Sequence, residues 1–340
     1  MIWARRLLGA LALVALLVSG WQVVQLWRAG GFWVERAEEA LEQVYTRALA
    51  RAATPARIAD LLDARLSEAP RNWHVIDALV AEGTALSPEL QARIDAARAQ
   101  DFGLAARARA CGICAYDLSR CTLGPDLVCG LGVNLTLAGD LLVLGREGLL
   151  ASQGGEVDGL DVTLAFIGIG ATGLVVATGG TSYTVKAGAG LVRVAHRMGR
   201  LAPDLRRVYT RAFREGVDWA GLARGVPVAS ATRAEALAPA LRLTDDLGLM
   251  LDRTGSAGTL HLLGAVDTLP EARSLARSAR ALGPRSTVAL ETLGKSRMIR
   301  LGLRLSDEVI AAFVALGAAF SALAAMFASR ALRLLRRALR

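Results

Sequence analysis

The four cysteines come closest, in type and spacing, to a defined chemistry. They fall in one short stretch that contains Cys111-Gly-Ile-Cys114, then Cys121 and Cys129. Three chemistries compete for such a set: two structural disulfides, a zinc site, or a redox-active Cys-x-x-Cys pair. A zinc ribbon needs a second close pair, which Cys121 and Cys129 do not form. Cys111 follows an alanine-rich helix, whose negative end disfavours the thiolate needed for redox chemistry. The sequence therefore favours two disulfides and leaves their pairing open.

The other residues that carry out chemistry in proteins do not gather into a catalytic set. The three histidines, His74, His196 and His261, are scattered, and His196 lies among arginines. The chain contains no Gly-x-Ser-x-Gly, no His-Glu-x-x-His and no phosphate loop. We therefore expect no catalytic residue, no cofactor and no metal site, and we do not expect an enzyme. The aspartates Asp158 and Asp161 are interpreted as a pair at a helix start.

The run 168–173, Gly-Ile-Gly-Ala-Thr-Gly, matches the glycine spacing of a dinucleotide-binding fingerprint. That fingerprint requires a following helix and an acidic residue about twenty positions on. Two glycines at 179–180 interrupt the helix, and position 193 is arginine. The pattern instead favours a glycine-rich apolar helix that packs closely on its neighbours.

A regular series of arginines follows this segment. Its members recur at helical spacing on what Pro203 divides into two successive helices. A basic amphipathic helix beside an apolar segment is typical of a membrane-surface helix, although a solvated face of a core helix fits equally well. The predicted membrane-surface residues are Arg193, Arg197, Arg200, Arg207, Arg211 and Arg214.

Composition favours helices and a membrane. Hydrophobic residues make up 53% of the chain and aromatic residues only 5%, so the apolar content consists mainly of Ala, Leu and Val. The net charge of +9 is concentrated in arginines beside apolar segments, where lipid headgroups explain it. Because basic and aromatic residues do not alternate, we expect no nucleic-acid partner.

Two uncharged runs predict membrane anchors at the two ends of the chain. Residues 7–26 follow two arginines and are long enough to cross a bilayer; a cleavable signal peptide is the alternative. Residues 309–329 precede an arginine-rich tail. Since positive flanks stay in the cytoplasm, both termini are expected there.

The third uncharged stretch, 162–185, is the ambiguous one. An even number of crossings favours packing within the domain or a re-entrant position; three spans with the tail outside is the alternative. Small residues on this stretch and on the last span predict close helix packing. These are Gly168, Gly173, Gly180, Ala311, Ala315 and Ala319.

The rest of the chain predicts an all-α exported domain. Thr54-Pro55, Asn72 and Ser87-Pro88 are start signals for helices. Beyond Pro203, further starts are expected near Thr232, Thr244, Pro270 and Pro284. We divide the chain into an anchor (1–28), a helical subdomain (29–110), a Cys-rich loop with a short helix (111–160), the glycine-rich and basic segment (161–214), a second helical subdomain (215–306), and the last span with its basic tail (307–340).

Taken together, the sequence predicts a bacterial inner-membrane protein with most of its chain in the periplasm. Its expected role is non-catalytic: a protein-interaction, scaffold or assembly component, with membrane lipid and either a protein partner or a second copy as partners. No small-molecule substrate is inferred. The alternative is a membrane-active or pore-related protein that uses the segment 162–185 and the basic helices after it.

Overall fold

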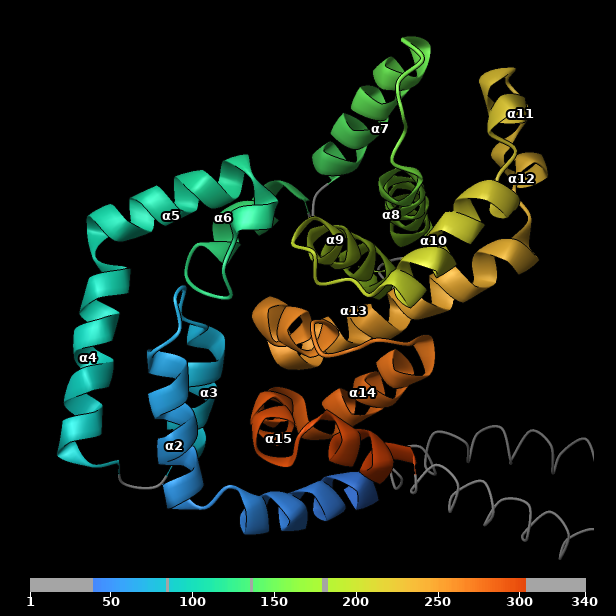
Figure 1. The fold of residues 1–340 in the computed structure, drawn as a ribbon. Coiled ribbons are helices and arrows are strands. Elements are labelled where there is room, and N and C mark those ends of the chain that lie inside the picture. Colours follow the sequence, from blue (N-terminus) through green and yellow to red (C-terminus); the bar gives the residue numbers. More distant parts are fainter. Residues whose placement is uncertain (1–38, 84–85, 135–136, 179–182, 304–340) are drawn as a thin grey trace, which may run out of the picture. The chain divides into compact units, whose positions relative to one another are not determined.

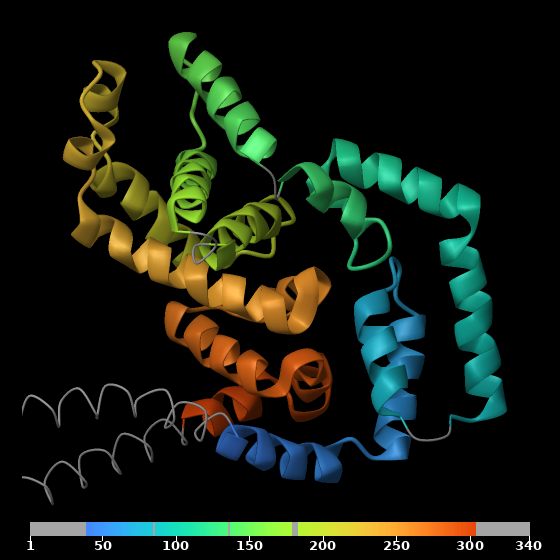
Figure 2. The same cartoon turned by 180° about the vertical axis from the view of Figure 1, so that it is seen from behind.

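The computed structural model describes residues 39–83, 86–134, 137–178 and 183–303. Contacts within the chain define a compact unit, Tyr45–Gly302, and a second unit formed by residues 1–44 and 303–340. Nearly all of the second unit lies outside the described residues. The description below therefore concerns Tyr45–Gly302, which Figure 1 and Figure 2 show from opposite sides.

The described residues form helices and no strand, which confirms the all-α prediction. A single bridge between Val217 and Thr232 is the only β-type pairing among them. The elements are α2 (Pro55–Leu66), α3 (Trp73–Glu82), α4 (Pro88–Phe102), α5 (Leu104–Tyr116), η1 (Leu118–Arg120), α6 (Leu127–Asn134), α7 (Leu137–Ser152), α8 (Gly159–Thr178), α9 (Tyr183–Arg197), α10 (Pro203–Gly216), α11 (Trp219–Ala223), α12 (Val228–Ala231), α13 (Ala234–Leu263), α14 (Leu269–Leu282), η2 (Gly283–Arg285) and α15 (Ser286–Leu293).

The predicted start signals cap the first helices. The side chains of Thr54, Asn72 and Ser87 accept hydrogen bonds from backbone N–H groups three residues on, at 3.3, 3.3 and 3.2 Å. Each bond satisfies one of the N–H groups that a helix leaves unpaired at its start. These caps fix where α2, α3 and α4 begin.

Two disulfides join α5 to the chain that follows it. Cys111 pairs with Cys129 and Cys114 with Cys121, which confirms the prediction of two disulfides and settles their pairing. No cysteine is left free for a zinc or redox site. Gly130 makes the close packing possible, because a Cβ atom there would lie 2.8 Å from the Cys114 Sγ.

The centre of the unit is the crossing of α9 over α13. Both helices are lined by buried aliphatic residues, and α9 packs more extensively on α13 than on any other described helix. At the crossing, a Cβ atom on Gly188 would lie 2.0 Å from the Thr244 carbonyl oxygen and 3.0 Å from the Gly248 nitrogen. Only glycine therefore allows this approach. Helix α8 packs beside α9, α10 packs on α8 and α13, and α14 and α15 also pack on α13.

The described part of the apolar stretch 162–185 belongs to this packing. Helix α8 contacts α7, α9 and α10, and its residues Leu164 and Ala165 are fully buried. No helix among the described residues is long and apolar enough to cross a membrane. The two predicted anchors, 7–26 and 309–329, lie outside those residues and stay predictions, as do the packing roles of Gly180, Ala311, Ala315 and Ala319.

Most of the later helix starts are close to those expected, but the one at Thr244 is wrong. Thr244 lies inside α13, where its hydroxyl donates to the Ala240 carbonyl one turn earlier. The Tyr209 hydroxyl also lies 3.1 Å from it. A threonine can bond back to its own helix as readily as it caps one, so the residue type alone does not mark a start. The real interruption of α13 is Gly255, whose φ of +70° breaks the helical conformation.

The two ends of the unit are held together by a buried tyrosine. The Tyr45 hydroxyl donates to the Met298 carbonyl oxygen at 2.6 Å and lies 2.6 Å from the Ser278 Oγ. Burial raises the pKa of Tyr45 to about 12, so the hydroxyl keeps its proton. A Cβ on Gly302 would lie 3.0 Å from the Ser274 Oγ. The chain therefore enters and leaves the unit at neighbouring points.

Replacing Gly188 with alanine tests the helix crossing. The added Cβ would collide with backbone of α13, so we expect Gly188→Ala to lower the free energy of unfolding by about 3 kcal/mol or more. Gly170→Ala is the matched control, since a Cβ there meets nothing within 4 Å. That control should be neutral or stabilise by about 0.5–1 kcal/mol. Urea denaturation of the purified proteins measures both, and equal stability of the two variants would contradict the close approach.

Candidate functional site

The densest cluster of charged side chains lies where α8 begins and α9 ends. Asp158 caps α8: its Oδ1 accepts from the backbone N–H groups of Leu160 and Asp161, at 3.0 and 3.3 Å. Its own N–H donates to the Glu147 Oε2 at 2.9 Å. The interpretation of Asp158 and Asp161 as a helix-start pair is thus confirmed. The fold also brings a distant histidine to this pair.

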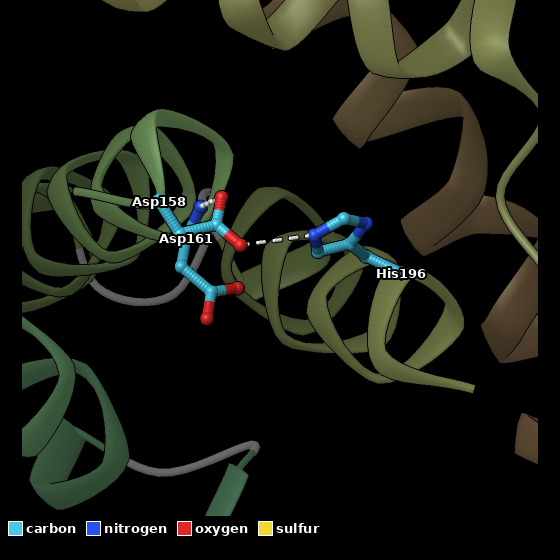
Figure 3. Close-up of side chains that lie close together, drawn as sticks. All are labelled: Asp158, Asp161 and His196. Atoms are coloured by element: carbon cyan, nitrogen blue, oxygen red, sulfur yellow. Dashed lines mark hydrogen bonds and ion pairs between the residues drawn. The ribbon is translucent and has the colours of Figure 1, made fainter. Parts of the chain in front are cut away.

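His196, near the end of α9, faces Asp158 across the gap between the two helices (Figure 3). The His196 Nε2 lies 3.1 Å from the Asp158 Oδ2. This hydrogen bond lowers the pKa of Asp158 to about 2 against the opposing effect of burial. The other ring nitrogen of His196 is covered and has no hydrogen-bond partner among the described residues. Neither nitrogen is thus presented to a substrate as a general base.

Asp161 is completely buried beside this pair. Its Oδ2 accepts from Arg197 and lies 3.6 Å from the Arg146 Nη2. Its Oδ1 has no hydrogen-bond partner among the described residues. A buried carboxylate oxygen without a partner costs on the order of 1–3 kcal/mol, and more when charged. One ligand atom each from Asp158, Asp161 and His196 lies within 4.8 Å of the others.

A pocket of about 550 Å³ opens beside the cluster. The Asp158–His196 pair lines one side of it and a basic face of α10 lines another, with Arg206, Arg207 and Arg214 exposed on that face. Arg207 is paired with Asp204 at 2.8 Å. The pocket therefore combines a carboxylate and imidazole wall with a cationic wall.

A second polar cluster lies in the core between α2, α3, α13 and α15. The His74 Nε2 lies 2.8 Å from the Thr287 Oγ1, and the His261 Nε2 lies 2.9 Å from the Glu291 Oε1. Arg65 donates to the other oxygen of Glu291 at 2.5 Å. The His261 Nε2 is close to the Glu291 carboxylate but makes no hydrogen bond of acceptable geometry among the described residues. The contacts of this cluster join α2, α3, α13 and α15.

The six arginines predicted as one membrane surface do not share a surface. The prediction is wrong for Arg193, which is fully buried and donates to the Asp140 Oδ1 at 2.6 Å. Arg197 forms an ion pair with Asp161, and Arg200 is half-buried next to Gly264. The other three, Arg207, Arg211 and Arg214, are exposed on α10. The series divides because α9 is surrounded by other helices and α10 is not.

Of the glycines predicted to pack helices closely, Gly168 and Gly173 lie among the described residues of α8. Gly168 does permit a close approach, but to a side chain: a Cβ there would lie 2.6 Å from the Asp140 Oδ2. Gly173 lies on α8, and its surroundings are outside the described side chains. Sequence reasoning missed Gly188, which stands at the closest helix crossing.

The grouping of Asp158, Asp161 and His196 was also missed. The only signal in the sequence is an Asp-x-x-Asp at a helix start, which is common without any ligand. Nothing in the spacing links it to His196, because the pairing of α8 with α9 brings them together. Comparison of the chain with family models, with curated proteins and with solved structures finds no match.

The core cluster generates a pH prediction. Burial, and next the neighbouring His261, lowers the pKa of His74 to about 4. The unfolded chain, with an ordinary histidine pKa near 6.5, takes up the proton first as the pH falls. His74 therefore does not lower the free energy of unfolding above pH ~6.5. Between about pH 6.5 and 4, it lowers the free energy of unfolding by up to about 3 kcal/mol.

Denaturation at a series of pH values measures this loss. A His74→Gln variant keeps a hydrogen-bonding group next to Thr287 but has no proton to take up, so its stability should fall less steeply between pH 7 and 4. Subtracting the free energy of unfolding of the variant from that of the unaltered protein at each pH removes the contribution of the titratable groups that the two proteins share. Parallel curves for the two proteins would show that His74 is not held neutral.

Proposed function

We propose that this chain is a membrane-anchored protein of the bacterial envelope whose helical unit Tyr45–Gly302 is exported and binds another protein. The observation that carries the proposal is the position of the two ends of the unit. Because Tyr45 bonds to Met298, the two ends of the unit Tyr45–Gly302 lie next to each other. Adjacent ends suit a domain that is tethered to one bilayer through both of its flanking segments.

The disulfides support export. Both pairs lie in a short, turn-rich part of the chain, and disulfides persist in oxidising compartments such as the periplasm. The two arginines before the first apolar run and the five after position 329 are expected to stay in the cytoplasm. This orientation places the unit between them on the outer side of the inner membrane.

An apolar surface on α7 supports a protein partner. Helix α7 contacts α6 and α8, and it carries several leucines that are exposed among the described residues. Leu142 and Leu149 are 65% and 60% exposed, and Leu141 is 56% exposed. A row of exposed leucines on one helix is typical of a surface that packs against another helix. We call these three residues and Leu150 the α7 leucine face.

Its position favours a protein over lipid as the occupant. In both Figure 1 and Figure 2, α7 lies at one end of the unit and the helical residues 45–52 lie at the other. If the anchors hold the 45–52 end at the bilayer, α7 belongs to the end of the unit that is remote from the lipid. We therefore assign this face to an apolar helix of a partner protein.

The membrane-active alternative gains no support from the described contacts. It requires the segment 162–185 to leave its neighbours and enter the bilayer. Helix α8 packs on three helices, and the adjacent Arg193 is buried in an ion pair with Asp140. Inserting that pair into lipid would be costly.

Orientation is tested by cleavage of the exported unit. A specific protease site inserted after Gly225, at an exposed turn with a φ of +86°, should be cut in intact spheroplasts. A tag after Arg340 should stay protected until the membrane is permeabilised. Intact-mass measurement without reductant should show no free thiol. Cleavage at the inserted site only after permeabilisation would overturn the proposed orientation.

The partner surface is tested by crosslinking in cells. A photoreactive residue at position 142 or 149 should form an adduct with one protein, identified by mass spectrometry, whereas the same residue at the exposed Gln91 of α4 should not. Leu142→Glu combined with the photoreactive residue at 149 should remove that adduct, because a charge cannot be buried in an apolar contact. Adducts only to lipid, only to a second copy of this chain, or to the same proteins from Gln91 would each overturn the assignment.

A further inference from the structure

We propose that Asp158, Asp161 and His196 form a binding site for a single Zn²⁺ ion. The sequence pattern predicts no metal site, because the aspartates precede or begin α8 whereas His196 lies near the end of α9, 35 or more positions later. The inference rests on three observations: the ligand types, their mutual distances, and a buried carboxylate oxygen that lacks a partner.

The ligand types and distances suit zinc. One imidazole nitrogen and two carboxylate oxygens are donors that Zn²⁺ accepts at about 2.0–2.2 Å. Ligands at these lengths in a tetrahedral site lie roughly 3.3 Å from one another. The His196 Nε2 and the Asp158 Oδ2 are already 3.1 Å apart, and all three donors fall within 4.8 Å. Small side-chain rotations are enough to bring them onto one ion.

The buried oxygen points to a ligand independently of this spacing. The Asp161 side chain is fully buried, its Oδ2 is held by Arg197, and its Oδ1 is left without a hydrogen bond among the described residues. Figure 3 shows one oxygen of Asp161 directed to the same side as the Asp158 carboxylate, toward His196. A cation bound by the Asp161 Oδ1 would satisfy that oxygen and would lie between the charges of two adjacent carboxylates.

The surrounding charges permit a divalent ion. Asp158, Asp161 and Glu147 carry three negative charges, and Arg146 and Arg197 carry two positive ones. The net charge of this group is therefore −1 with His196 neutral. Arg197 pairs with the Asp161 carboxylate, as outer residues commonly do for carboxylate ligands, and Glu147 accepts from the backbone N–H of Asp158.

The open side of the site faces the arginines of α10. Three protein ligands leave a fourth position on a tetrahedral zinc ion. That position opens toward the pocket lined by Arg206 and Arg214, which form no ion pair with an acid among the described residues and favour an anion there. The site would thus hold zinc with water or a small anion as its fourth ligand.

Isothermal titration of the full-length protein in detergent, without reductant, tests the proposal with Zn²⁺ alone. We expect one ion per chain. His196→Gln should weaken binding by about 10-fold or more, and so should Asp158→Asn, which keeps a capping residue at the start of α8. His261→Gln is the control, because His261 is buried in the other cluster, and it should bind zinc as the unaltered protein does.

Thermal unfolding gives a second readout. Zn²⁺ should raise the melting temperature of the unaltered protein and of His261→Gln, and should raise it less or not at all in the other two variants. Ca²⁺ and Mg²⁺, which prefer more oxygen ligands, should have little effect. Absence of zinc binding to the unaltered protein, or equal binding by all four proteins, would overturn the assignment.

Discussion

The arrangement of the central helices depends on one buried ion pair, Arg193 with Asp140. The guanidinium of Arg193 is completely buried on α9, and a charge in such a position is tolerated only with a partner and hydrogen bonds. Asp140, on α7, supplies that partner at 2.6 Å, although burial by itself raises the pKa of its carboxyl group. Asp140 fits because position 168 on α8 is glycine. The positions of α7, α8 and α9 relative to one another therefore depend on Arg193, Asp140 and Gly168.

The same constraint explains the position of α7. This helix is attached to α8 and α9 largely by polar contacts: Asp140 with Arg193, Arg146 with Asp161, and Glu147 with the backbone of Asp158. With its polar side turned inward, its leucines face outward. In most surface helices the orientation is the reverse. Covering exposed leucines with another apolar surface is favourable, which is the physical basis for assigning them to another protein.

The two proposed activities lie in different parts of one unit. Tyr45 joins the ends that lead to the apolar flanks, and α7 presents its leucines at the opposite end. The cluster of Asp158, Asp161 and His196 lies beside the C-terminal half of α7, next to Glu147 and Arg146.

The sequence by itself determined what depends on local chemistry. Helical periodicity and the capping residues Thr54, Asn72 and Ser87 were sufficient to place the first helices and the all-α class, because caps act within one turn. The even set of clustered cysteines was sufficient to predict two disulfides, but their pairing needed the packing of α5 on α6. A threonine such as Thr244 misled the prediction, since its hydroxyl can satisfy its own helix.

Only the tertiary structure decided which charges are buried. Spacing placed Arg193 and Arg207 in one basic series, yet one is enclosed by helices and the other is exposed. The tertiary structure also brings His196 close to Asp158 and Asp161, which lie 35 or more positions away in the sequence. It places Gly188, which no sequence pattern singled out, at the close crossing of α9 and α13. These features depend on which helices pack together. Packing is set by the fit of whole surfaces, which a one-dimensional pattern of residue types does not contain.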